Sequence, residues 1–359
     1  MVQAPPRPPD AAEVPPPGSG PGRRPRWILA ACLLVVLAVV VGVLVSRPQP
    51  EPTAEPAPEA PSEGEPEGEP EDSEPTSSEE EDDEGPDLVW VGTVGDGDWR
   101  EDWGLEGDPQ FENTSVKKAP SGGHGQALRI SNDGGGEDGE RWGFDGRFDL
   151  TEIGVEPLEE AYFRYYVWFP DDYEFDTQGK MPGLHGVAPG ESVSPEGITC
   201  PEGHPYEGED CRDPRGFGSR TMWKDGGMIT YLGAVSVGKQ EVDDLRTDSG
   251  DNYAYARTYR DADGDELRLK KGWNYVEQRV KLNTPGETDG IFEGWINGVR
   301  GVRLTNVQWR SDDYPDLRIN RWNLAHFWGG PPSDYPEDAT AVYYDDFAIA
   351  RTPIGPRPD

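Results

Sequence analysis

Two segments of the chain alternate between two kinds of side chain with the period of a β-strand that has two different faces. Residues 161–170 (AYFRYYVWFP) place aromatic rings and Val167 on one face, and Arg164 among aromatic side chains on the other. Residues 273–283 (WNYVEQRVKLN) place Glu277, Arg279 and Lys281 together on one face. Both segments therefore predict strands, each with an outward face that carries cations.

Shorter runs of the same kind, separated by turn dipeptides, predict further strands. These runs are residues 127–131, 228–232, 291–296, 318–327 and 341–350, and the dipeptides are Asn297-Gly298, Asp263-Gly264, Pro285-Gly286 and Asp225-Gly226. Outside the N-terminal region, no stretch of ten or more residues has a helical period. The pattern predicts an all-β fold, an antiparallel β-sandwich or jelly roll.

The N-terminal region has a different pattern. Residues 1–26 are rich in proline and end in a cluster of arginines, so we expect a disordered segment. Residues 27–46 begin with nineteen positions that contain no charge and no proline, and such a helix is roughly 28 Å long, about one hydrocarbon core. We predict a transmembrane helix. The arginine cluster predicts a cytoplasmic N-terminus and an extracytoplasmic C-terminal domain, so the chain is expected to be a single-pass membrane protein.

Two alternatives to the transmembrane helix are weaker. A cleaved signal peptide has a shorter apolar stretch and is followed by a small-residue cleavage motif, which is missing here before Arg47. Residues 29–32 (LAAC) resemble a lipoprotein cleavage box, but the apolar run continues well beyond them.

Residues 47–87 are predicted to form a disordered acidic stalk. From residue 51 to residue 87 there are 17 Asp or Glu, 8 Pro and no Lys or Arg. Such a segment cannot bury enough apolar area to offset its ordering entropy, and its charges repel one another. A spacer between membrane and domain is favoured over an acidic tail that binds a partner.

The remaining residues, 88–359, are enough for one large domain. The whole chain has a formal charge of −37, which argues against a nucleic-acid partner because that role needs a basic surface. Cys200 and Cys211 lie in a Gly- and Pro-rich stretch, where an exported protein favours a disulfide. A zinc site with His204 lacks a clear fourth ligand. The acidic run 261–266 fits a solvated hairpin turn better than a calcium loop. We expect no metal and no cofactor.

The combination of aromatic rings with Arg164, and of Arg279 with Lys281, suits an anionic polysaccharide as partner. Aromatic rings offer apolar platforms to sugar faces, and guanidinium groups pair bidentately with carboxylates. The alternative, which the pattern leaves equally open, is a solvated sheet face with cross-strand ion pairs.

A set of motifs in the right order resembles polysaccharide lyase family 14, which includes alginate and glucuronan lyase-like proteins, and its relative family 20. Residues 179–184 (GKMPGL) are similar to the family's GKLPGL motif. Residues 276–290 (VEQRVKLNTPGETDG) match a second segment of the family almost residue for residue. Weaker similarities are found at residues 166–175, 219–223 (SRTMW), 292–298, 326–330 and 344–349. The resemblance covers residues 149–351 and implies a jelly roll; residues 88–148 are consistent with its first strands.

The resemblance implies β-elimination at a uronic acid, without a metal. This reaction needs a cation at the C5 carboxylate, a base for the C5 proton and an acid for the glycosidic oxygen. The motifs place Lys180 at the family's catalytic lysine, Arg220 at its strand arginine and Tyr231 at the second tyrosine of a Tyr-x-Tyr pair. Because an acidic domain must attract a polyanion, we expect one cleft to hold the substrate-binding cations together with Lys180 and Arg220. These substrate-binding cations are Arg164, Arg279 and Lys281.

The chain departs from the family pattern at three positions. Gly218 stands where the family has a serine, which Ser219 could replace through a bulge, and Ile229 stands at the first tyrosine. His185 follows KMPGL, where relatives often have Tyr or a small residue. We expect His185 to lie near Lys180, where it could act as the base because an ordinary histidine pKa lies near working pH. His326 is a candidate substrate-binding residue. For both histidines, and for each cation, a purely structural role is the alternative.

The losses at Gly218 and Ile229 leave open a protein that binds sugar without cleaving it, a lectin-like sandwich similar to concanavalin or laminin-G domains. A glycoside hydrolase is less favoured, because no compact pair of carboxylates stands out on the predicted strands. A polysaccharide lyase that is anchored in the membrane and acts on a uronate polymer outside the cytoplasm is the function that the sequence favours.

Overall fold

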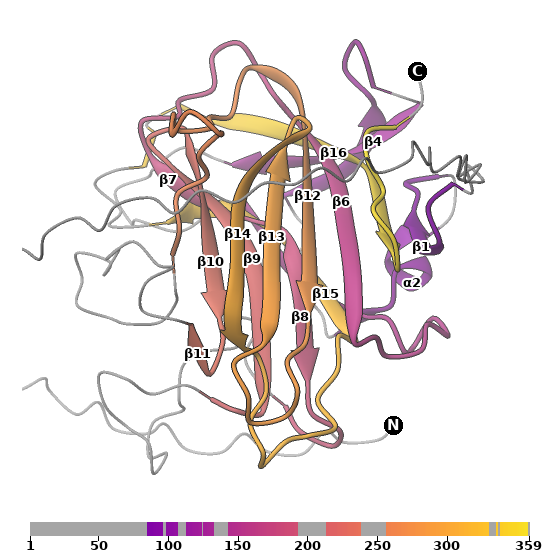
Figure 1. Ribbon diagram of the computed structural model, residues 1–359. Helices are drawn as coiled ribbons and strands as arrows, with labels where there is room; N and C mark the ends of the chain where they lie inside the picture. Colours follow the sequence, from indigo (N-terminus) through magenta and orange to yellow (C-terminus); the bar gives the residue numbers. More distant parts are fainter. Residues whose placement is uncertain are drawn as a thin grey trace, which may run out of the picture. The chain divides into compact units, whose positions relative to one another are not determined.

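The computed structural model describes residues 85–95, 98–106, 113–123, 125–132, 143–192, 213–237, 256–329, 335–336 and 338–357. All of them belong to the unit formed by residues 80–359. Two antiparallel β-sheets lie face to face in this unit, as Figure 1 shows. The prediction of an all-β antiparallel sandwich is therefore confirmed.

The larger sheet, sheet A, contains nine strands among the described residues. In spatial order they are β11 (Ser236–Val237), β14 (Val299–Gln308), β13 (Gly290–Ile296), β12 (Gly272–Lys281), β6 (Glu160–Phe169), β16 (Thr340–Ala350), β4 (Gln126–Asn132) and β3 (Thr114–Lys118), with β1 (Leu88–Gly92) also paired to β16.

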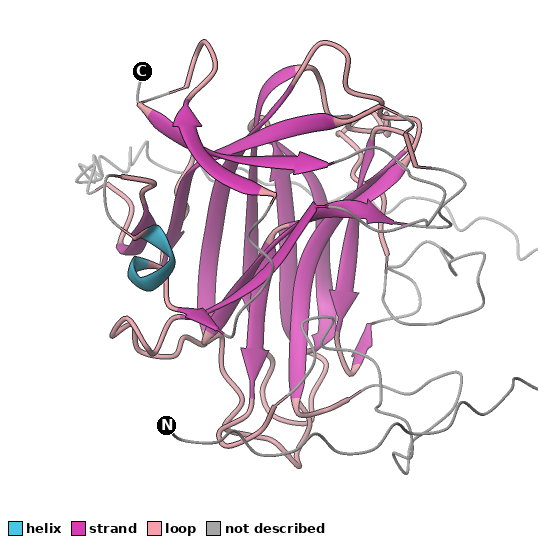
Figure 2. Ribbon diagram, turned by 180° about the vertical axis from the view of Figure 1, so that it is seen from behind, coloured by secondary structure: helices cyan, strands magenta, loops and turns pink. Residues whose placement is uncertain are grey.

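The smaller sheet, sheet B, contains seven strands within the same described ranges. In spatial order they are β10 (Gly227–Gly233), β9 (Gly216–Lys224), β7 (Gln178–Met181), β15 (Arg321–Gly329), β5 (Gly143–Asp149) and β2 (Leu105–Glu106), with β8 (Gly183–Val187) paired to β15 and β9. A short helix, α2 (Trp99–Asp102), precedes β2 and is the helix drawn in Figure 2.

Each strand predicted from alternation forms a strand, and the turn dipeptides lie at turns. Asn297 and Gly298 join β13 to β14 with φ of 50° and 86°, and Asp225 and Gly226 join β9 to β10 with φ of 51° and 80°. Such two-residue turns require a positive φ at both positions, which Asn, Asp and Gly tolerate. In the acidic run 261–266, Asp261 accepts hydrogen bonds from the backbone of Asp263 and Asp265, as a hairpin turn does.

The alternation of polar and apolar residues did not predict strand β9, because its residues do not alternate. Eight of its nine residues are buried, so both of its faces lack the exposed positions that mark a strand in the sequence. Strand β7 is interrupted at Pro182 and continues as β8. Burial on both faces removes the alternation by which β8 and β9 could have been recognised in the sequence.

The core lies between the two sheets and contains buried polar contacts as well as apolar ones. Phe163, Val167 and Phe169 of β6 are fully buried. The hydroxyl oxygens of Tyr165 and Thr221, on opposite sheets, are 3.0 Å apart. Such satisfied polar contacts between sheets specify how the layers face one another.

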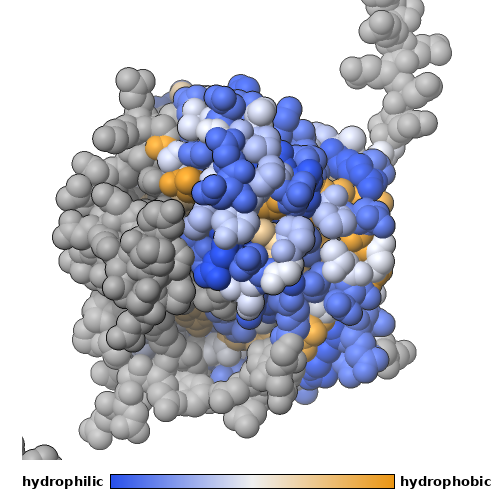
Figure 3. Space-filling model, turned by 90° about the horizontal axis from the view of Figure 1, so that it is seen from below, coloured by the Kyte–Doolittle hydropathy of each residue, from blue (hydrophilic) through white to orange (hydrophobic). Residues whose placement is uncertain are grey.

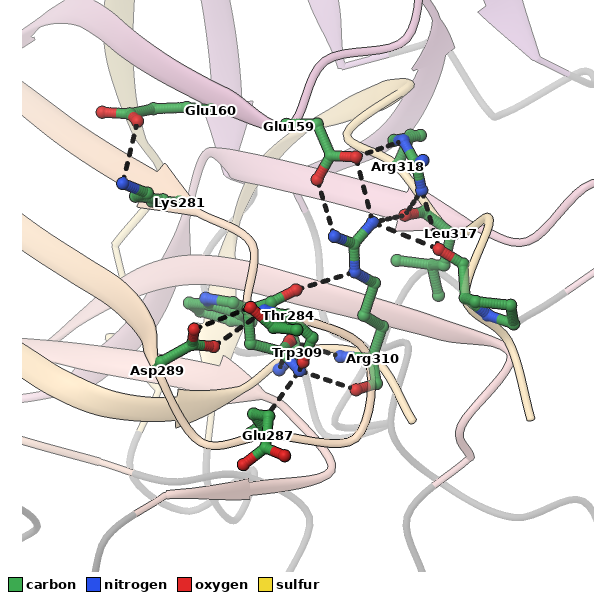
Figure 4. Close-up of polar contacts among 12 residues, drawn as sticks. Glu159, Glu160, Lys281, Thr284, Glu287, Asp289, Trp309, Arg310, Leu317 and Arg318 are labelled. Atoms are coloured by element: carbon green, nitrogen blue, oxygen red, sulfur yellow. Dashed lines mark hydrogen bonds and ion pairs between the residues drawn. The ribbon is translucent and has the colours of Figure 1, made fainter. Parts of the chain in front are cut away.

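The loop after β12 is fastened to the end of β14 by one buried asparagine. Asn283 Oδ1 accepts hydrogen bonds from the backbone of Trp309 (2.8 Å) and Arg310 (3.0 Å). Its Nδ2 donates to the carbonyls of Thr284 (2.7 Å), Glu287 (2.9 Å) and Arg310 (2.9 Å). The Arg310 side chain in turn contacts Glu159, as Figure 4 shows. The asparagine of the NTPG motif therefore has a structural role.

The described surface seen in Figure 3 is mostly hydrophilic, with small separate hydrophobic areas. Within the described ranges, no helix is both long enough and apolar enough to cross a membrane. The predicted segments 1–26 and 27–46, and nearly all of the predicted stalk 47–87, lie outside the described residues, as do Cys200, His204 and Cys211.

Candidate functional site

Lys180, Arg220 and Tyr231 come from three neighbouring strands of sheet B and lie on one face. Tyr231 pairs directly with Arg220, and Lys180 pairs with Met222, two positions along β9. Directly paired residues share a face, and so do residues two apart on a strand. Ser219, the residue before Arg220, has the opposite phase and donates a hydrogen bond to Gln278 of sheet A, so Arg220, Tyr231 and Lys180 lie on the side away from the core. We call this surface the outer face of sheet B.

Both cations lie close to the ring of Tyr231. Lys180 Nζ is 3.1 Å from the centroid of the ring, and the guanidinium carbon of Arg220 is 5.5 Å from it. Lys180 Nζ is also 3.5 Å from the sulfur of Met222. Cations over an aromatic face are attracted by its quadrupole, which holds the three groups together. The arrangement gathers two positive charges and a phenol in one place.

Arg220 is positioned by residues that the sequence reasoning missed. It is 3% exposed, and one of its terminal nitrogens is 3.6 Å from a carboxylate oxygen of Asp145 on β5. Asn323 of β15 donates a 2.8 Å hydrogen bond to the other oxygen of Asp145. The alternation of β5 (GFDGRFD) could have indicated these side chains, because it places Asp145, Arg147 and Asp149 on one face.

His185 lies on the same face but not beside Lys180. It pairs with Gly218, which stands four residues from the partner of Lys180 on β9, a separation of about 13 Å at 3.3 Å per residue. Its ring lies beside Gly218: a Cβ added there would be in ordinary contact with it, 3.6 Å from His185 Cδ2. The prediction that His185 lies near Lys180 is wrong.

The pKa of His185 also differs from the ordinary histidine value that was expected from the sequence. The side chain is buried, and neither ring nitrogen has a hydrogen-bond partner among the described residues. Burial, followed by the charges of Arg147, Arg321 and Arg220, lowers the pKa of His185 to about 3. The imidazole is neutral at neutral pH and far too weakly basic for the predicted role as a general base.

This burial predicts a pH dependence of stability. A histidine whose pKa is lowered from 6.5 to about 3 by folding binds more protons when unfolded, so stability falls as the pH falls through this window. Between pH 7.5 and 5, His185 is expected to account for a loss of about 2 kcal/mol in the free energy of unfolding. Urea denaturation at both pH values measures it. His185→Gln should lose about that much less than the unchanged chain; equal losses would contradict the assignment.

Two predicted substrate-binding residues point into the core instead. Ser219 donates to Gln278 Oε1 (2.6 Å) on sheet A, and β9 pairs with β10 without a bulge, so Ser219 does not replace the family serine. His326 Nδ1 is 2.9 Å from the hydroxyl of Tyr344, and its ring stacks on Trp223. Burial lowers the pKa of His326 to about 3. Both predictions are wrong, because each residue is in the inward phase of its strand.

The other three predicted cations lie on the opposite sheet. Arg164, Arg279 and Lys281 project from β6 and β12 in the phase of Glu160 and Glu277, away from the core of sheet A. We call this surface the outer face of sheet A. The prediction that five cations line one cleft is therefore wrong, because the two groups lie on opposite sides of the sandwich.

Each of these three cations has a polar partner, on a strand of sheet A or in the C-terminal segment. Arg279 contacts Glu160 at 2.7 Å and Glu293 at 2.7 Å, and Lys281 is 3.9 Å from Glu160. Arg164 donates to the carbonyl of Gly355 in the C-terminal segment. Cross-strand ion pairs thus account for Arg279 and Lys281, the alternative that the sequence left open. No cluster of three or more metal-binding side chains occurs among the described residues.

The family model described as Polysaccharide lyase 14 matches residues 139–347. No curated protein matches the chain.

Solved structures are similar over most of the chain. The PL-14 alginate lyase from Aplysia kurodai is 19% identical, with a TM-score of 0.56, over 74% of this chain and 99% of that one. An alginate lyase from Chlorella virus is 19% identical (TM-score 0.49, 70% and 93% covered), and an endo-β-1,4-glucuronan lyase from Trichoderma reesei is 13% identical (TM-score 0.46, 74% and 96% covered). At this level of identity, the first of these supports the fold alone.

Proposed function

Since this chain belongs to the polysaccharide lyase 14 family, and is thus a carbon–oxygen lyase that acts on polysaccharides, we propose that it cleaves a uronate-containing polymer by β-elimination. The observation that carries the proposal is the group formed by Lys180, Arg220 and Tyr231 on the outer face of sheet B. The solved relatives described above include alginate lyases and a glucuronan lyase, which favours a polymer of the alginate or glucuronan type.

The proposed reaction uses the charges of this group. Lys180 and Arg220 pair with the C5 carboxylate of the sugar and neutralise it, so the C5 proton becomes more acidic. Tyr231, as its phenolate, accepts the C5 proton and then donates that proton to the glycosidic oxygen as it leaves, so the phenolate is regenerated. The electrons of the C5–H bond form a C4=C5 double bond as the C4–O4 bond breaks. The reaction needs neither water nor an oxidant.

The negative net charge of the chain does not by itself support a polyanionic substrate. Two further arginines, Arg147 and Arg321, share the outer face of sheet B with Lys180 and Arg220. Their charges are partly balanced by carboxylates, because Glu106 and Asp149 each lie within 3 Å of Arg321. The proposal therefore rests on the local geometry at Lys180, where two cations meet over one ring.

The experiment that tests the reaction follows the unsaturated product. Residues 88–359 are incubated with alginate, glucuronan and glycosaminoglycans, and the ultraviolet absorbance of the new double bond is recorded. We expect absorbance to rise with at least one uronate polymer and not with a neutral glucan. Binding of a uronate polymer without any rise in absorbance would instead support the lectin-like alternative, in which the changes at Gly218 and Ile229 have removed catalysis.

We also propose that the domain is anchored outside the cytoplasm. The support is the sequence: residues 27–45 have no charge or proline, arginines precede them, and an acidic stalk follows. In cells that express the full chain, the domain should remain with the membrane fraction and be digested by added protease without lysis. Recovery in the soluble cytoplasmic fraction would contradict the proposal.

A further inference from the structure

An open hollow of ≈ 380 Å³ lies on the outer face of sheet A, away from the Lys180 group. Its floor is made by three adjacent strands, because Tyr343 of β16 pairs with Trp168 of β6 on one side and with Arg129 of β4 on the other. Ser131 and Asp172 also line it. The volume is at the small end of the range of about 300–1,000 Å³ for small-molecule sites.

Two aromatic rings form an apolar corner in this hollow. The rings of Trp168 and Tyr343 are 5.5 Å apart between centroids and nearly perpendicular, at 81°. Both side chains are partly exposed, although most large aromatic residues of this domain are buried. A floor and a wall of aromatic surface suit the C–H face of a sugar ring, which packs on such rings while its hydroxyls stay in water.

Arg129 lies beside this corner, and its guanidinium group is available to a ligand. In the part of the chain that the structure describes, its side chain has no ion pair and no hydrogen bond, whereas Arg279 on the same face contacts two carboxylates. A partly exposed guanidinium next to aromatic rings can take a carboxylate bidentately. Ser131 and the exposed Asp172 can bond sugar hydroxyls.

We propose that this hollow is a second, non-catalytic binding site for a uronate unit of the polysaccharide, with the ring on Trp168 and the carboxylate on Arg129. The identity of the sugar rests on the proposed function. Lys180 and Arg129 project from opposite sheets, so a polymer held here is bound without blocking the reaction, and the hollow increases affinity for long chains by engaging them at two places.

The test measures binding of intact polymer. The full chain with Lys180→Ala is used as the background, so that the polymer stays uncut. The retardation of this protein is measured by electrophoresis in gels that contain alginate, glucuronan or a neutral glucan. Trp168→Ala and Arg129→Met, each added to this background, should weaken binding of the retarding uronan about fivefold to tenfold. Lys281→Met, which removes the same charge from the same face outside the hollow, should leave binding unchanged.

Turnover provides a second measurement that a general loss of structure would not reproduce. In the chain with Lys180 intact, Trp168→Ala and Arg129→Met should raise KM for long polymer about threefold to tenfold and leave kcat unchanged. For short oligosaccharides, which cannot reach both faces, kcat/KM should not change.

Three outcomes would overturn the site. The first is unchanged binding of the uronan in both Trp168→Ala and Arg129→Met. The second is a loss of binding in Lys281→Met equal to that in the hollow variants. The third is retardation of the protein by the neutral glucan that equals its retardation by the uronan and also depends on Arg129. If the chain cleaves a uronan but the hollow variants behave like their parent, only this site fails. If the unchanged chain neither cleaves nor is retarded by any uronan, the proposed function fails as well.

Discussion

Replacing Lys180 by alanine is expected to lower kcat/KM for the cleaved polymer by at least about a thousandfold while the domain stays folded. The ammonium group is 3.1 Å from the centroid of the Tyr231 ring, and its removal leaves Arg220 as the sole cation of the group. Without Lys180 the carboxylate of the substrate is only partly neutralised, so the C5 proton stays less acidic. Product absorbance measures the rate, and circular dichroism checks the fold.

Lys281→Ala is the matched control for this variant. Lys281 is also a lysine near one end of a strand, but it lies on the outer face of sheet A, where it is 3.9 Å from Glu160. An exposed pair of this kind contributes little to stability, so activity and stability should both change little. Equal loss of activity in the two variants, or full activity in Lys180→Ala, would remove Lys180 from the mechanism.

Replacing Asn283 by alanine is expected to lower the free energy of unfolding by about 3–5 kcal/mol. The fully buried asparagine side chain accepts from two backbone N–H groups and donates to three carbonyls, as described above. Alanine would leave these buried groups without partners, and each unsatisfied group costs about 1–3 kcal/mol. Urea denaturation at neutral pH measures the change.

Thr284→Val serves as the control in the same loop. The Thr284 hydroxyl donates to Asp289 at the surface, a contact drawn in Figure 4, so its loss should cost less than about 1 kcal/mol. Asn283→Ala should keep the kcat of the folded fraction, because Asn283 follows β12 of sheet A and Lys180 belongs to sheet B. A stability loss no larger than that of Thr284→Val would show that the network does not hold the loop.

The contrast between Asn283→Ala and Lys180→Ala shows that the family motifs contain residues of two kinds, those that stabilise the fold and those that carry the chemistry. Residues 276–290 gave the most extensive match, yet Arg279 makes cross-strand ion pairs there and Asn283 fastens a loop. The short segment around Lys180 contributes the cation of the candidate site. A long stretch of sequence similarity can therefore report the needs of folding, whereas a single lysine in a short motif carries the chemistry.

The sequence by itself determined the strands whose faces differ and the turns whose backbone requires Asn, Asp or Gly, because these are local properties of the chain. It also determined the family, and it identified Lys180, Arg220 and Tyr231, which lie together in the structure. Alternation alone did not reveal β9, because burial on both of its faces removes the alternation; the strand was indicated only by the resemblance of residues 219–223 to the family.

Only the tertiary structure decided which side of the sandwich each charge occupies. Alternation shows that a side chain points outward, but a sandwich has two outward faces, and the pairing of distant strands decides between them. That pairing put Arg164, Arg279 and Lys281 on sheet A and turned Ser219 and His326 into the core. It also buried His185 near three arginines, and the burial first, then the arginine charges, hold the pKa of His185 far below 6.5. It also brought Trp168, Tyr343 and Arg129 together from three strands, because side-by-side contact across a sheet depends on register between segments far apart in the chain.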